Sequence, residues 1–371
     1  MRLSSLTLEH FRNYSSQTLA FKGNRHLFLG PNGSGKTNLL EAIAVLSLTK
    51  SFRGREDQEL VMWGETFYRV RGEVEADGGD HLRLEIVNEQ EPRRRKAAFR
   101  NDVRIPLTRL VGELPSVAFL PQDLLLFSGP PAERRRFLDQ LLCQVSPEYL
   151  ALFSDYQKVL QQRNALLRRI VRGEEKPDAL ALWDGALSKH GSAVTLARLE
   201  LLETLNLTFQ QELQSLGERW EEVTLRYRRR GEKRSQPAME EELLMMLSQS
   251  RERDLLLQST TTGPHREDWQ VVVADRELPT FASRGQERTA VLALLFLEVS
   301  YVELRRDEKP IILLDDVFSE LDDAHQEALL GNLEGHQVFL TATRHPPQLD
   351  GMQIWEVENG SIRPQRAAAV R

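Results

Sequence analysis

Hydrophobic residues recur with two different periods along the chain, and the change of period divides it into regions. Near the N-terminus they alternate with polar residues, as at Leu6 and Leu8, and this alternation predicts a first strand. Residues 25–29 are a short, mainly apolar run and predict a second strand. Residues 68–75 and 81–87 also alternate and predict a hairpin, whose turn is the Asp-Gly-Gly-Asp sequence between them. The N-terminal region is therefore expected to be rich in strands.

From residue 121 to about residue 246 the period becomes that of helices. Residues 148–172 place apolar side chains close to a helical repeat, and a second helical run is expected over residues 179–217. Gly173 is expected to end the first of these helices. The polar stretch at residues 226–237 is expected to be a loop.

Apolar runs return in the last part of the chain. Residues 288–304 predict a strongly apolar helix, and residues 311–314 and 337–341 predict short buried strands. Residues 362–371 are expected to be a loose tail. Strand-rich ends around a helical middle indicate an α/β protein with a mainly helical insertion.

Composition limits the class of protein without identifying it. Hydrophobic residues make up 40% and charged residues 28% of the chain, a mixture typical of globular proteins rather than disordered ones. No apolar run is long enough to predict a membrane span, and no secretory signal is recognisable at the N-terminus. Cys143 is the one cysteine, so no disulfide can form within the chain. A cytoplasmic location is therefore expected.

Charge is unevenly distributed along the sequence. The formal net charge of -6 argues weakly against nucleic-acid binding, but basic residues form three clusters, at residues 93–96, 134–136 and 226–230. Local basic patches of this kind bind phosphate backbones. We therefore expect DNA binding to need the arginine clusters, above all the one at residues 134–136. The alternative is a helix face that forms salt bridges with Glu133 and Asp139.

Residues 30–37 read Gly-Pro-Asn-Gly-Ser-Gly-Lys-Thr, between a predicted strand and a predicted helix. Glycines let successive backbone N–H groups curl around a phosphate, and the helix N-terminus behind them adds about half a positive charge. A chance glycine-rich turn is the alternative, but the flanking strand and helix favour a phosphate site. Lys36 is expected on the β- and γ-phosphates and Thr37 on Mg²⁺. The residues expected to hold ATP are Gly30, Pro31, Asn32, Gly33, Ser34, Gly35, Lys36 and Thr37.

A nucleotide site also needs acidic groups at the end of a second strand. Asp315 and Asp316 directly follow the apolar run at residues 311–314. The carboxyl ends of parallel strands are where ligands bind in such sheets. Asp315 is expected to hold Mg²⁺, directly or through water, and Asp316 to orient or deprotonate the attacking water.

A third motif, Ser283-Arg284-Gly285-Gln286, stands at the start of the helix expected over residues 288–304. A serine hydroxyl and glycine N–H groups at a helix start can cradle an anion, although an ordinary helix cap has the same sequence. Its position about thirty residues before Asp315 favours a nucleotide role for Ser283, Gly285 and Gln286.

The order of these motifs resembles the ATP-binding-cassette (ABC) head of the SMC/Rad50 group of ATPases. Fewer than 250 residues separate the glycine loop from the serine motif, which excludes the long coiled coil of SMC proteins. The resemblance implies a two-lobed α/β fold. Residues 1–120 and 305–371 would form the ATPase lobe, and residues 121–304 an inserted, mainly helical lobe.

Further motifs resemble the RecF family of bacterial DNA repair proteins. They are spread over nearly the whole chain: Phe11-Arg12-Asn13-Tyr14, Lys50-Ser51-Phe52-Arg53, Gly129-Pro130, Arg135-Arg136-Phe137-Leu138-Asp139, Gln162-Arg163-Asn164 and Thr262-Gly263-Pro264-His265-Arg266. The resemblance implies binding to single-stranded, gapped or junction DNA, cooperation with RecO and RecR, and assistance in loading the RecA recombinase. It also implies an ATP-dependent homodimer in which Ser283 completes the partner's site, with slow ATP hydrolysis.

Some positions depart from the general cassette pattern. Asp316 stands where transporters usually carry glutamate, and Thr341 where a switch histidine is expected. By resemblance, Gln122 is expected near the metal and Arg12 near nucleotide or DNA. These departures, and the incomplete serine motif, argue against the nucleotide-binding subunit of a membrane transporter. A non-catalytic ATP-binding scaffold of the replication or translation machinery stays open as an alternative.

Overall fold

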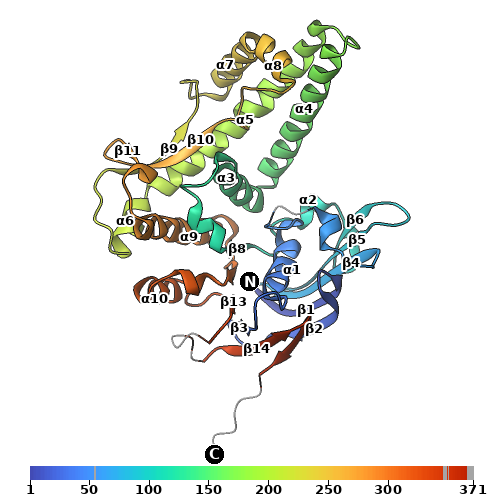
Figure 1. The fold of residues 1–371 in the computed structure, drawn as a ribbon, viewed down its shortest axis with the longest axis vertical. Helices are drawn as coiled ribbons and strands as arrows, with labels where there is room; N and C mark the ends of the chain where they lie inside the picture. Colours follow the sequence, from blue (N-terminus) through green and yellow to red (C-terminus); the bar gives the residue numbers. More distant parts are fainter. Residues whose placement is uncertain (54–55, 346–348, 350, 366–371) are drawn as a thin grey trace, which may run out of the picture. The chain divides into compact units, whose positions relative to one another are not determined.

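The computed structural model describes residues 1–53, 56–345, 349 and 351–365. The chain divides into two compact units. The first, called here the ATPase unit, joins the N-terminal segment Met1–Leu125 to the C-terminal segment Arg288–Arg371. The second, called the helical unit, is the intervening segment Leu126–Glu287. Figure 1 shows these segments by their colours along the sequence.

One sheet of the ATPase unit has six strands in the order β2-β1-β4-β5-β6-β7, and all its pairs are antiparallel. The strands are β1 (Arg2–Phe11), β2 (Tyr14–Ala20), β4 (Phe67–Glu75), β5 (His81–Glu89), β6 (Arg95–Arg100) and β7 (Val103–Ile105). Buried residues alternate along β4, as its sequence pattern predicts. The predicted hairpin is confirmed, because Glu75 pairs with His81 across the Asp-Gly-Gly-Asp turn.

The other sheet of this unit also has six strands, in the order β15-β14-β3-β13-β12-β8. The strands are β3 (Arg25–Leu29), β8 (Ser116–Phe119), β12 (Ile311–Asp315), β13 (Val338–Ala342), β14 (Gln353–Glu358) and β15 (Ser361–Pro364). All pairs are parallel except β14 with β15. The register aligns Asp315 with Thr341, and Thr341 in turn with Phe28. The carboxyl ends of β3, β13 and β12 therefore meet at one edge of the sheet.

Helix α1 (Lys36–Leu48) packs against both sheets of the ATPase unit and is buried on nearly all of its faces. Its apolar sequence fits this central position, because a helix that is hydrophobic all round belongs in a core. The same core takes side chains from β1, β4, β12 and β13. The unit also contains α2 (Leu107–Leu110), η1 (Asp57–Leu60), η2 (Pro121–Leu125) and η5 (Val317–Glu320).

Helix α9 (Arg284–Arg306) and helix α10 (Asp323–Asn332) complete the ATPase unit. Residues 288–304, which were expected in the helical lobe, belong to the ATPase unit from Arg288 onward. The reason is that α9 bonds to elements of that unit: Thr289 meets His325 of α10 at 2.9 Å, and Arg306 donates to the Gly112 carbonyl at 2.6 Å. None of the helices in the described residues is long and apolar enough to cross a membrane.

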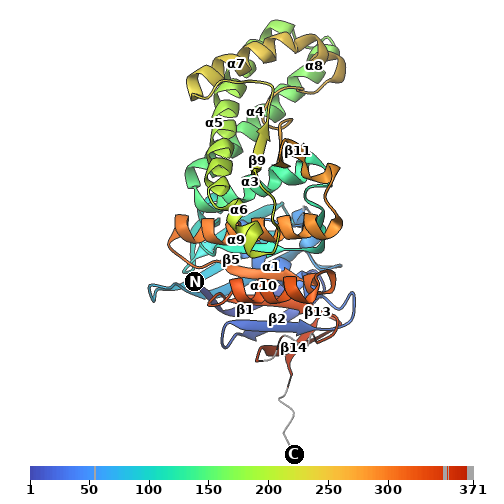
Figure 2. The same cartoon turned by 90° about the vertical axis from the view of Figure 1, so that its left-hand side faces the viewer.

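The helical unit combines six helices with a three-stranded sheet in the order β11-β10-β9. Helices α4 and α5 pack against each other, and α7 and α8 lie at the same end of this pair in both views (Figures 1 and 2). The helices are α3 (Pro131–Val145), α4 (Pro147–Val171), α5 (Leu180–Asn206), α6 (Phe209–Ser215), α7 (Gln236–Gln249) and α8 (Arg251–Leu257). The strands are β9 (Val223–Arg228), β10 (Asp268–Val273) and β11 (Arg276–Glu277), with short turns η3 (Pro177–Ala179) and η4 (Leu278–Thr280).

Two sequence predictions about this chain are wrong in part. Residues 226–237 contain the end of β9 and the start of α7, because Arg226 and Arg228 pair with β10 as an exposed, basic strand face. The tail prediction fails at β15, which pairs with β14 through Ile362. The remainder of the tail, from residue 366, lies outside the described residues.

Candidate functional site

The glycine loop joins β3 to α1 at the edge of the parallel sheet. Gly35 immediately precedes the helix with a φ of 117°, which favours glycine. A Cβ atom there would come within 2.5 Å of the Asn13 side chain and 2.9 Å of the Tyr14 hydroxyl. The sequence therefore needs glycine here for both conformation and space.

Residues of the Phe-Arg-Asn-Tyr motif support the loop from behind. Asn13 donates its side-chain amide to the Ser34 carbonyl at 3.0 Å, and the Tyr14 hydroxyl donates to the Gly35 carbonyl at 2.9 Å. Gly360 donates its backbone N–H to the same Ser34 carbonyl at 3.2 Å. These bonds engage carbonyl oxygens of the loop and not its N–H groups, of which those of Gly30 and Ser34 make only long bonds, to the Ala342 carbonyl at 3.4 Å and the Pro31 carbonyl at 3.3 Å. The Ser34 hydroxyl is buried and has no hydrogen-bond partner in the described structure, so it is left for a ligand.

Lys36 lies at the first position of α1 and its side chain folds back over the loop. The ammonium donates to the carbonyls of Gly30 at 2.7 Å and Pro31 at 3.0 Å. Burial lowers the pKa of this ammonium, and the negative charges of Asp316 and Asp315 oppose that effect. A buried cation held by neutral carbonyls is free to transfer to a charged phosphate oxygen.

Thr37, Asp315 and Thr341 meet at the carboxyl ends of the strands. The Thr37 hydroxyl donates to Asp315 Oδ1 at 2.9 Å, and the Thr341 hydroxyl donates to the same oxygen at 2.8 Å. The sheet register explains the meeting, because Asp315 and Thr341 are aligned on neighbouring strands. The structure thus brings Thr37 and Asp315, both expected to bind Mg²⁺, together at one edge of the sheet, and metal binding stays a prediction.

Asp316 directly follows β12 in a left-handed backbone conformation, with a φ of 52°. Its N–H donates to the Thr341 hydroxyl at 2.9 Å, which fixes the backbone at this point. Burial raises the pKa of the Asp316 carboxyl, and nearby Lys36 opposes the rise. Thr341 thus bonds to both aspartate positions, at the place where a histidine was expected from the general cassette pattern.

Arg12, which is expected near nucleotide or DNA, forms hydrogen bonds within the ATPase unit. Its guanidinium donates twice to the Glu41 carboxylate, at 2.9 and 3.0 Å, and once to the Glu59 carbonyl at 2.6 Å. Ser51 donates to the same Glu41 at 2.5 Å. Two of the family-like motifs therefore anchor one buried carboxylate of α1. Contact between Arg12 and nucleotide stays a prediction, as does the metal contact of Gln122 in η2.

The serine motif forms a reciprocal helix cap in the helical unit. The Ser283 N–H donates to the Gln286 side chain at 3.0 Å, and the Gln286 N–H donates to the Ser283 hydroxyl at 3.3 Å. Ser283, Arg284 and Gly285 are exposed at the N-terminus of α9. The motif is therefore an ordinary helix cap, and this cap is exposed. Anion binding by Ser283, Gly285 and Gln286 stays a prediction.

The prediction of DNA contact is wrong for Arg134, which is only 3% exposed. Its guanidinium makes two bonds of 2.8 Å to Asp268 and also donates to three backbone carbonyls. Arg136 pairs with Glu133 at 3.3 Å, whereas Asp139 pairs with Arg198 rather than with its own helix. The cluster is mainly structural because its first member is needed to fasten α3 to β10.

A buried ionic network in the helical unit was missed by sequence reasoning. Arg163 is fully buried and donates to Asp184 at 2.8 Å and to Asp254 at 2.7 Å. It also donates to the Thr260 hydroxyl at 2.9 Å, and Asn164 accepts bonds from the same threonine. The Gln-Arg-Asn motif was visible in the sequence. Its partners were not, since they lie between 20 and 100 positions further along the chain.

Three comparisons with known proteins agree with this site. The family model described as RecF/RecN/SMC N terminal domain matches residues 2–357. The chain is 37% identical to the DNA replication and repair protein RecF of Heliobacterium modesticaldum, over 98% of this chain and 99% of that protein. It is 38% identical to RecF of Moorella thermoacetica, over 97% of this chain and 96% of that one.

Solved structures give the same result. The structure of "the recombination mediator protein RecF-ATPrS in RecFOR pathway" matches with a TM-score of 0.90 and 31% identity, covering 98% of each chain. An Smc head bound to part of ScpA matches with a TM-score of 0.56 and 14% identity, which supports the fold alone. The longest helix in the described residues, α5, has 27 residues, so no long coiled coil is present there. The chain therefore belongs to the RecF family of DNA replication and repair proteins, with the head-like fold that this family shares with SMC proteins.

Proposed function

We propose that the chain is an ATP-dependent DNA-binding protein of recombinational repair and replication restart. The observation that carries this proposal is the meeting of Thr37, Asp315 and Thr341 beside a glycine loop with a free Ser34 hydroxyl. Full-length similarity to RecF proteins, among them one solved with ATP, supports the same nucleotide. The site would bind ATP through the loop N–H groups, with Lys36 moving from the Gly30 and Pro31 carbonyls to the phosphates.

The residues at the strand ends also fit a magnesium ion. A threonine hydroxyl and a carboxylate oxygen already lie 2.9 Å apart, at Thr37 and Asp315, and oxygen ligands of this kind suit Mg²⁺. When bound, the ion would neutralise phosphate charge. Thr341 would hold the Asp315 carboxylate in place through its 2.8 Å hydrogen bond. Gln122 is proposed as a further group near the ion.

Slow ATP hydrolysis is proposed as the reaction of this site. Asp316 would accept a hydrogen bond from the attacking water and orient it toward the γ-phosphate. Its backbone is fixed by Thr341, and the raised pKa of its carboxyl makes it a better proton acceptor than an ordinary aspartate. An aspartate is one methylene shorter than the glutamate of transporters, so the water is less closely held and turnover is slow.

Two copies of the chain are proposed to share their sites when ATP is bound. The exposed cap formed by Ser283, Gly285 and Gln286 would contact the γ-phosphate held by the partner's glycine loop. A symmetric dimer then has two equivalent sites, and ATP favours it because the contacts exist only in the closed pair. ATP would thus close the dimer on single-stranded, gapped or junction DNA, and hydrolysis would release it. We propose RecO and RecR as its partners. The outcome of their cooperation would be the loading of RecA.

Binding of ATP and of DNA tests the main proposal directly. Gapped, single-stranded and duplex DNA are titrated with ATP or ADP over a range of salt concentrations, and ATP turnover is followed with each DNA. We expect ATP to tighten binding to gapped DNA and Lys36→Met to abolish the effect. An intact chain that fails to bind ATP, or binds DNA equally with ATP and ADP, contradicts the proposal. Binding without any turnover supports the scaffold alternative.

The shared site needs a mixing experiment. Lys36→Met and Ser283→Arg are each expected to be inactive, and a mixture in equal amounts forms mixed dimers with one intact site. If chains mix at random and sites act independently, hydrolysis recovers to about one quarter of the wild-type rate. Light scattering measures the dimer separately. A wild-type chain that stays monomeric at saturating ATP, with and without DNA, rules the shared site out.

A further inference from the structure

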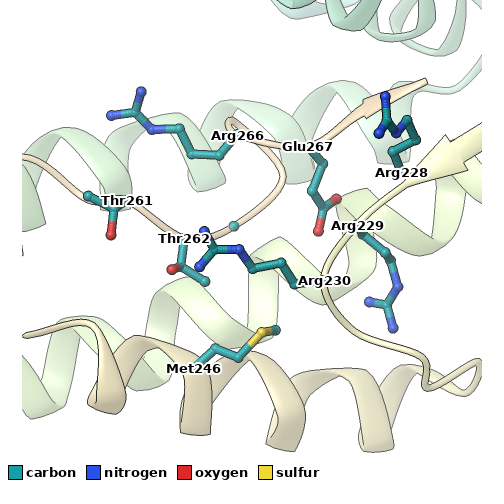
Figure 3. Close-up of a pocket in the computed structure, with 9 residues that line it drawn as sticks. Arg228, Arg229, Arg230, Met246, Thr261, Thr262, Arg266 and Glu267 are labelled. Carbon is teal, nitrogen blue, oxygen red and sulfur yellow. The ribbon is translucent and has the colours of Figure 1, made fainter. Parts of the chain in front are cut away.

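The helical unit contains a cavity of about 260 Å³ whose lining residues are distinct from those of the glycine loop (Figure 3). Four arginines line it, at positions 228, 229, 230 and 266, together with the Thr-Thr-Gly segment at residues 261–263. Strand β9 and the residues after it supply three of the arginines, and the loop before β10 supplies the fourth. Four cations around one small cavity point to an anionic ligand.

Two of the four guanidinium groups are neutralised by carboxylates. Arg228 pairs with Glu277 at 2.6 Å, and Arg229 pairs with Glu242 at 2.8 Å. Arg266 donates only to neutral acceptors, the Thr260 carbonyl at 3.2 Å and the Ser259 hydroxyl at 3.0 Å. Arg230 is exposed and has no acidic partner within the described residues.

The lining carboxylate, Glu267, does not compensate these two charges. Its Oε2 atom accepts hydrogen bonds from the hydroxyls of Tyr227 at 2.7 Å and Thr195 at 2.9 Å. Burial raises the pKa of this carboxyl, and its hydrogen bonds with Tyr227 and Thr195 oppose the rise. The cavity therefore keeps the positive charge of Arg230 and Arg266.

The floor of the cavity is held rigidly. Asp254 accepts hydrogen bonds from both the N–H and the hydroxyl of Thr261, at 2.9 and 2.6 Å. Gly263 has a φ of 126°, and a Cβ atom there would press on the Tyr156 hydroxyl at 3.3 Å. Thr262 is buried, and its hydroxyl has no partner within the described structure. Figure 3 shows Arg230 reaching toward this threonine, with Met246 on the opposite side.

From these contacts we infer that the cavity binds a phosphate group of a DNA strand. Guanidinium groups form paired, charge-assisted hydrogen bonds with phosphate oxygens, and the Thr262 hydroxyl is a further donor for the same ligand. A preorganised floor lowers the entropy lost on binding. The choice of DNA as the source of the phosphate rests on the proposed function, whereas the anion site itself rests on the cavity alone.

The first experiment measures the anion site without DNA. The Lys36→Met background removes the competing phosphate site, and inorganic pyrophosphate is the probe. We expect pyrophosphate to raise the melting temperature of this background, and not that of the same chain with Arg230→Met and Arg266→Met added. Arg226→Met is the control, since Arg226 lies on β9, four positions before Arg230, but pairs with Asp275 and does not line the cavity. Equal effects of pyrophosphate on all three chains overturn the inference.

The second experiment identifies the source of the phosphate. With Lys36 intact, gapped DNA carrying either a 5′-phosphate or a 5′-hydroxyl is titrated across salt concentrations. We expect the Arg230→Met/Arg266→Met variant to bind several-fold more weakly, with the slope of log K against log salt reduced by about 1. If the variant loses affinity only for 5′-phosphorylated DNA, the cavity binds the terminal phosphate. If it loses affinity equally for both DNAs, the cavity binds an internal phosphate.

Wild-type affinity and slope in the folded double variant overturn the assignment to DNA. If the wild-type chain binds no DNA but pyrophosphate still stabilises it through these arginines, the proposed function fails and the anion site stands. Circular dichroism of each variant confirms that the helical unit is folded before binding is compared.

Discussion

Lys36 of the ATPase unit and Arg163 of the helical unit are both buried cations in sequence motifs, but their partners differ. Among the described residues, the Lys36 ammonium donates hydrogen bonds to the neutral carbonyls of Gly30 and Pro31 and forms no ion pair, although Asp315 and Asp316 are near enough to affect its pKa. Arg163 lies between the carboxylates of Asp184 and Asp254. A cation with neutral partners keeps its charge for a ligand, whereas one between two carboxylates is already neutralised. The comparison teaches that the charge of the contacting groups, and not burial, is what distinguishes a buried cation available to a ligand from a structural one.

The largest expected effect comes from removing the structural cation. Arg163→Met leaves the buried carboxylate of Asp254 without a counter-charge, whereas Asp184 keeps its ion pair with Arg251 at 2.7 Å. We expect a loss of about 3–5 kcal/mol in the free energy of unfolding. Urea denaturation followed by circular dichroism measures it. Arg168→Met on the exposed face of the same helix is the control and is expected to change stability by less than about 0.5 kcal/mol. A loss below about 1 kcal/mol for Arg163→Met removes the contrast with Lys36.

Three arginines of the helical unit affect the pKa of the buried His265. His265 accepts a hydrogen bond from Tyr156 at 2.5 Å and donates one to the Thr260 carbonyl at 3.0 Å. Burial and, to a smaller extent, the positive charges of Arg266, Arg135 and Arg198 together lower the pKa of His265 from 6.5 to about 4, although the hydrogen bond to the Thr260 carbonyl opposes the shift. In the unfolded chain the imidazole is protonated at a higher pH than in the folded one. Stability is therefore lost as the pH falls from about 6.5 to about 4.

The size of this loss is at most about 3 kcal/mol for the full shift. We expect His265→Gln to remove the corresponding part of the pH dependence, measured as urea midpoints at pH 7.5 and 4.5. His81→Gln, at an exposed position in β5, is the control and should follow the wild type. If His265→Gln and the wild type lose the same stability on acidification, the histidine does not carry the effect.

A smaller change, in the activation free energy of ATP hydrolysis, is expected for a substitution at Asp316. It should appear in the turnover rate and not in the stability of the fold. Asp316→Asn removes the proton acceptor for water, and we expect ATP turnover to fall by about 100-fold, or 2.7 kcal/mol of barrier. The melting temperature and ATP affinity should stay close to those of the wild type, since the Asp316 backbone and not its carboxylate bonds to Thr341. Single-turnover hydrolysis measures the rate. Wild-type turnover in this variant would show that another group orients the water.

The smallest effect is expected at Arg136, which is half-buried and lies two positions after the buried Arg134. Its i,i+3 pair with Glu133 is about one-third exposed on the arginine side. Such pairs contribute about 0.2–0.5 kcal/mol in low salt. Arg136→Met should therefore shift the urea midpoint only slightly, and the shift should disappear in 1 M salt. A loss of several kcal/mol would mean that the whole cluster is structural, as Arg134 is.

The sequence allowed prediction of the parts of the fold and site that depend on local pattern. The glycine loop, the apolar strand before Asp315 and helix α4 each follow from residues that are adjacent or one turn apart. The partners of Arg134 and Arg163 did not follow, because Asp268 and Asp254 are contributed by elements 134 and 91 positions further on. Strand β9 was missed for a similar reason: its outward face is basic, so only pairing with β10 reveals it.

Thr341 shows where the family resemblance was informative and where it was insufficient. The cassette pattern led us to expect a switch histidine in the segment 341–343, and the register places Thr341 of this segment beside Asp315. The expected histidine is absent, however, and a hydroxyl bonds there instead to Asp315 and to the backbone of Asp316. The role of a residue of different chemistry can be found only from its contacts.

The strand order has a consequence for the order of synthesis. Strand β3, which leads into the glycine loop, has both of its neighbours, β13 and β14, from residues 338–358, and Gly360 bonds to the loop itself. On the ribosome, residues 25–37 emerge long before these neighbours are made, and the whole helical unit is translated in between. A nascent chain that ends before residue 338 therefore lacks both neighbours of β3. The loop can take the place described here only after residues 338–360 have been made.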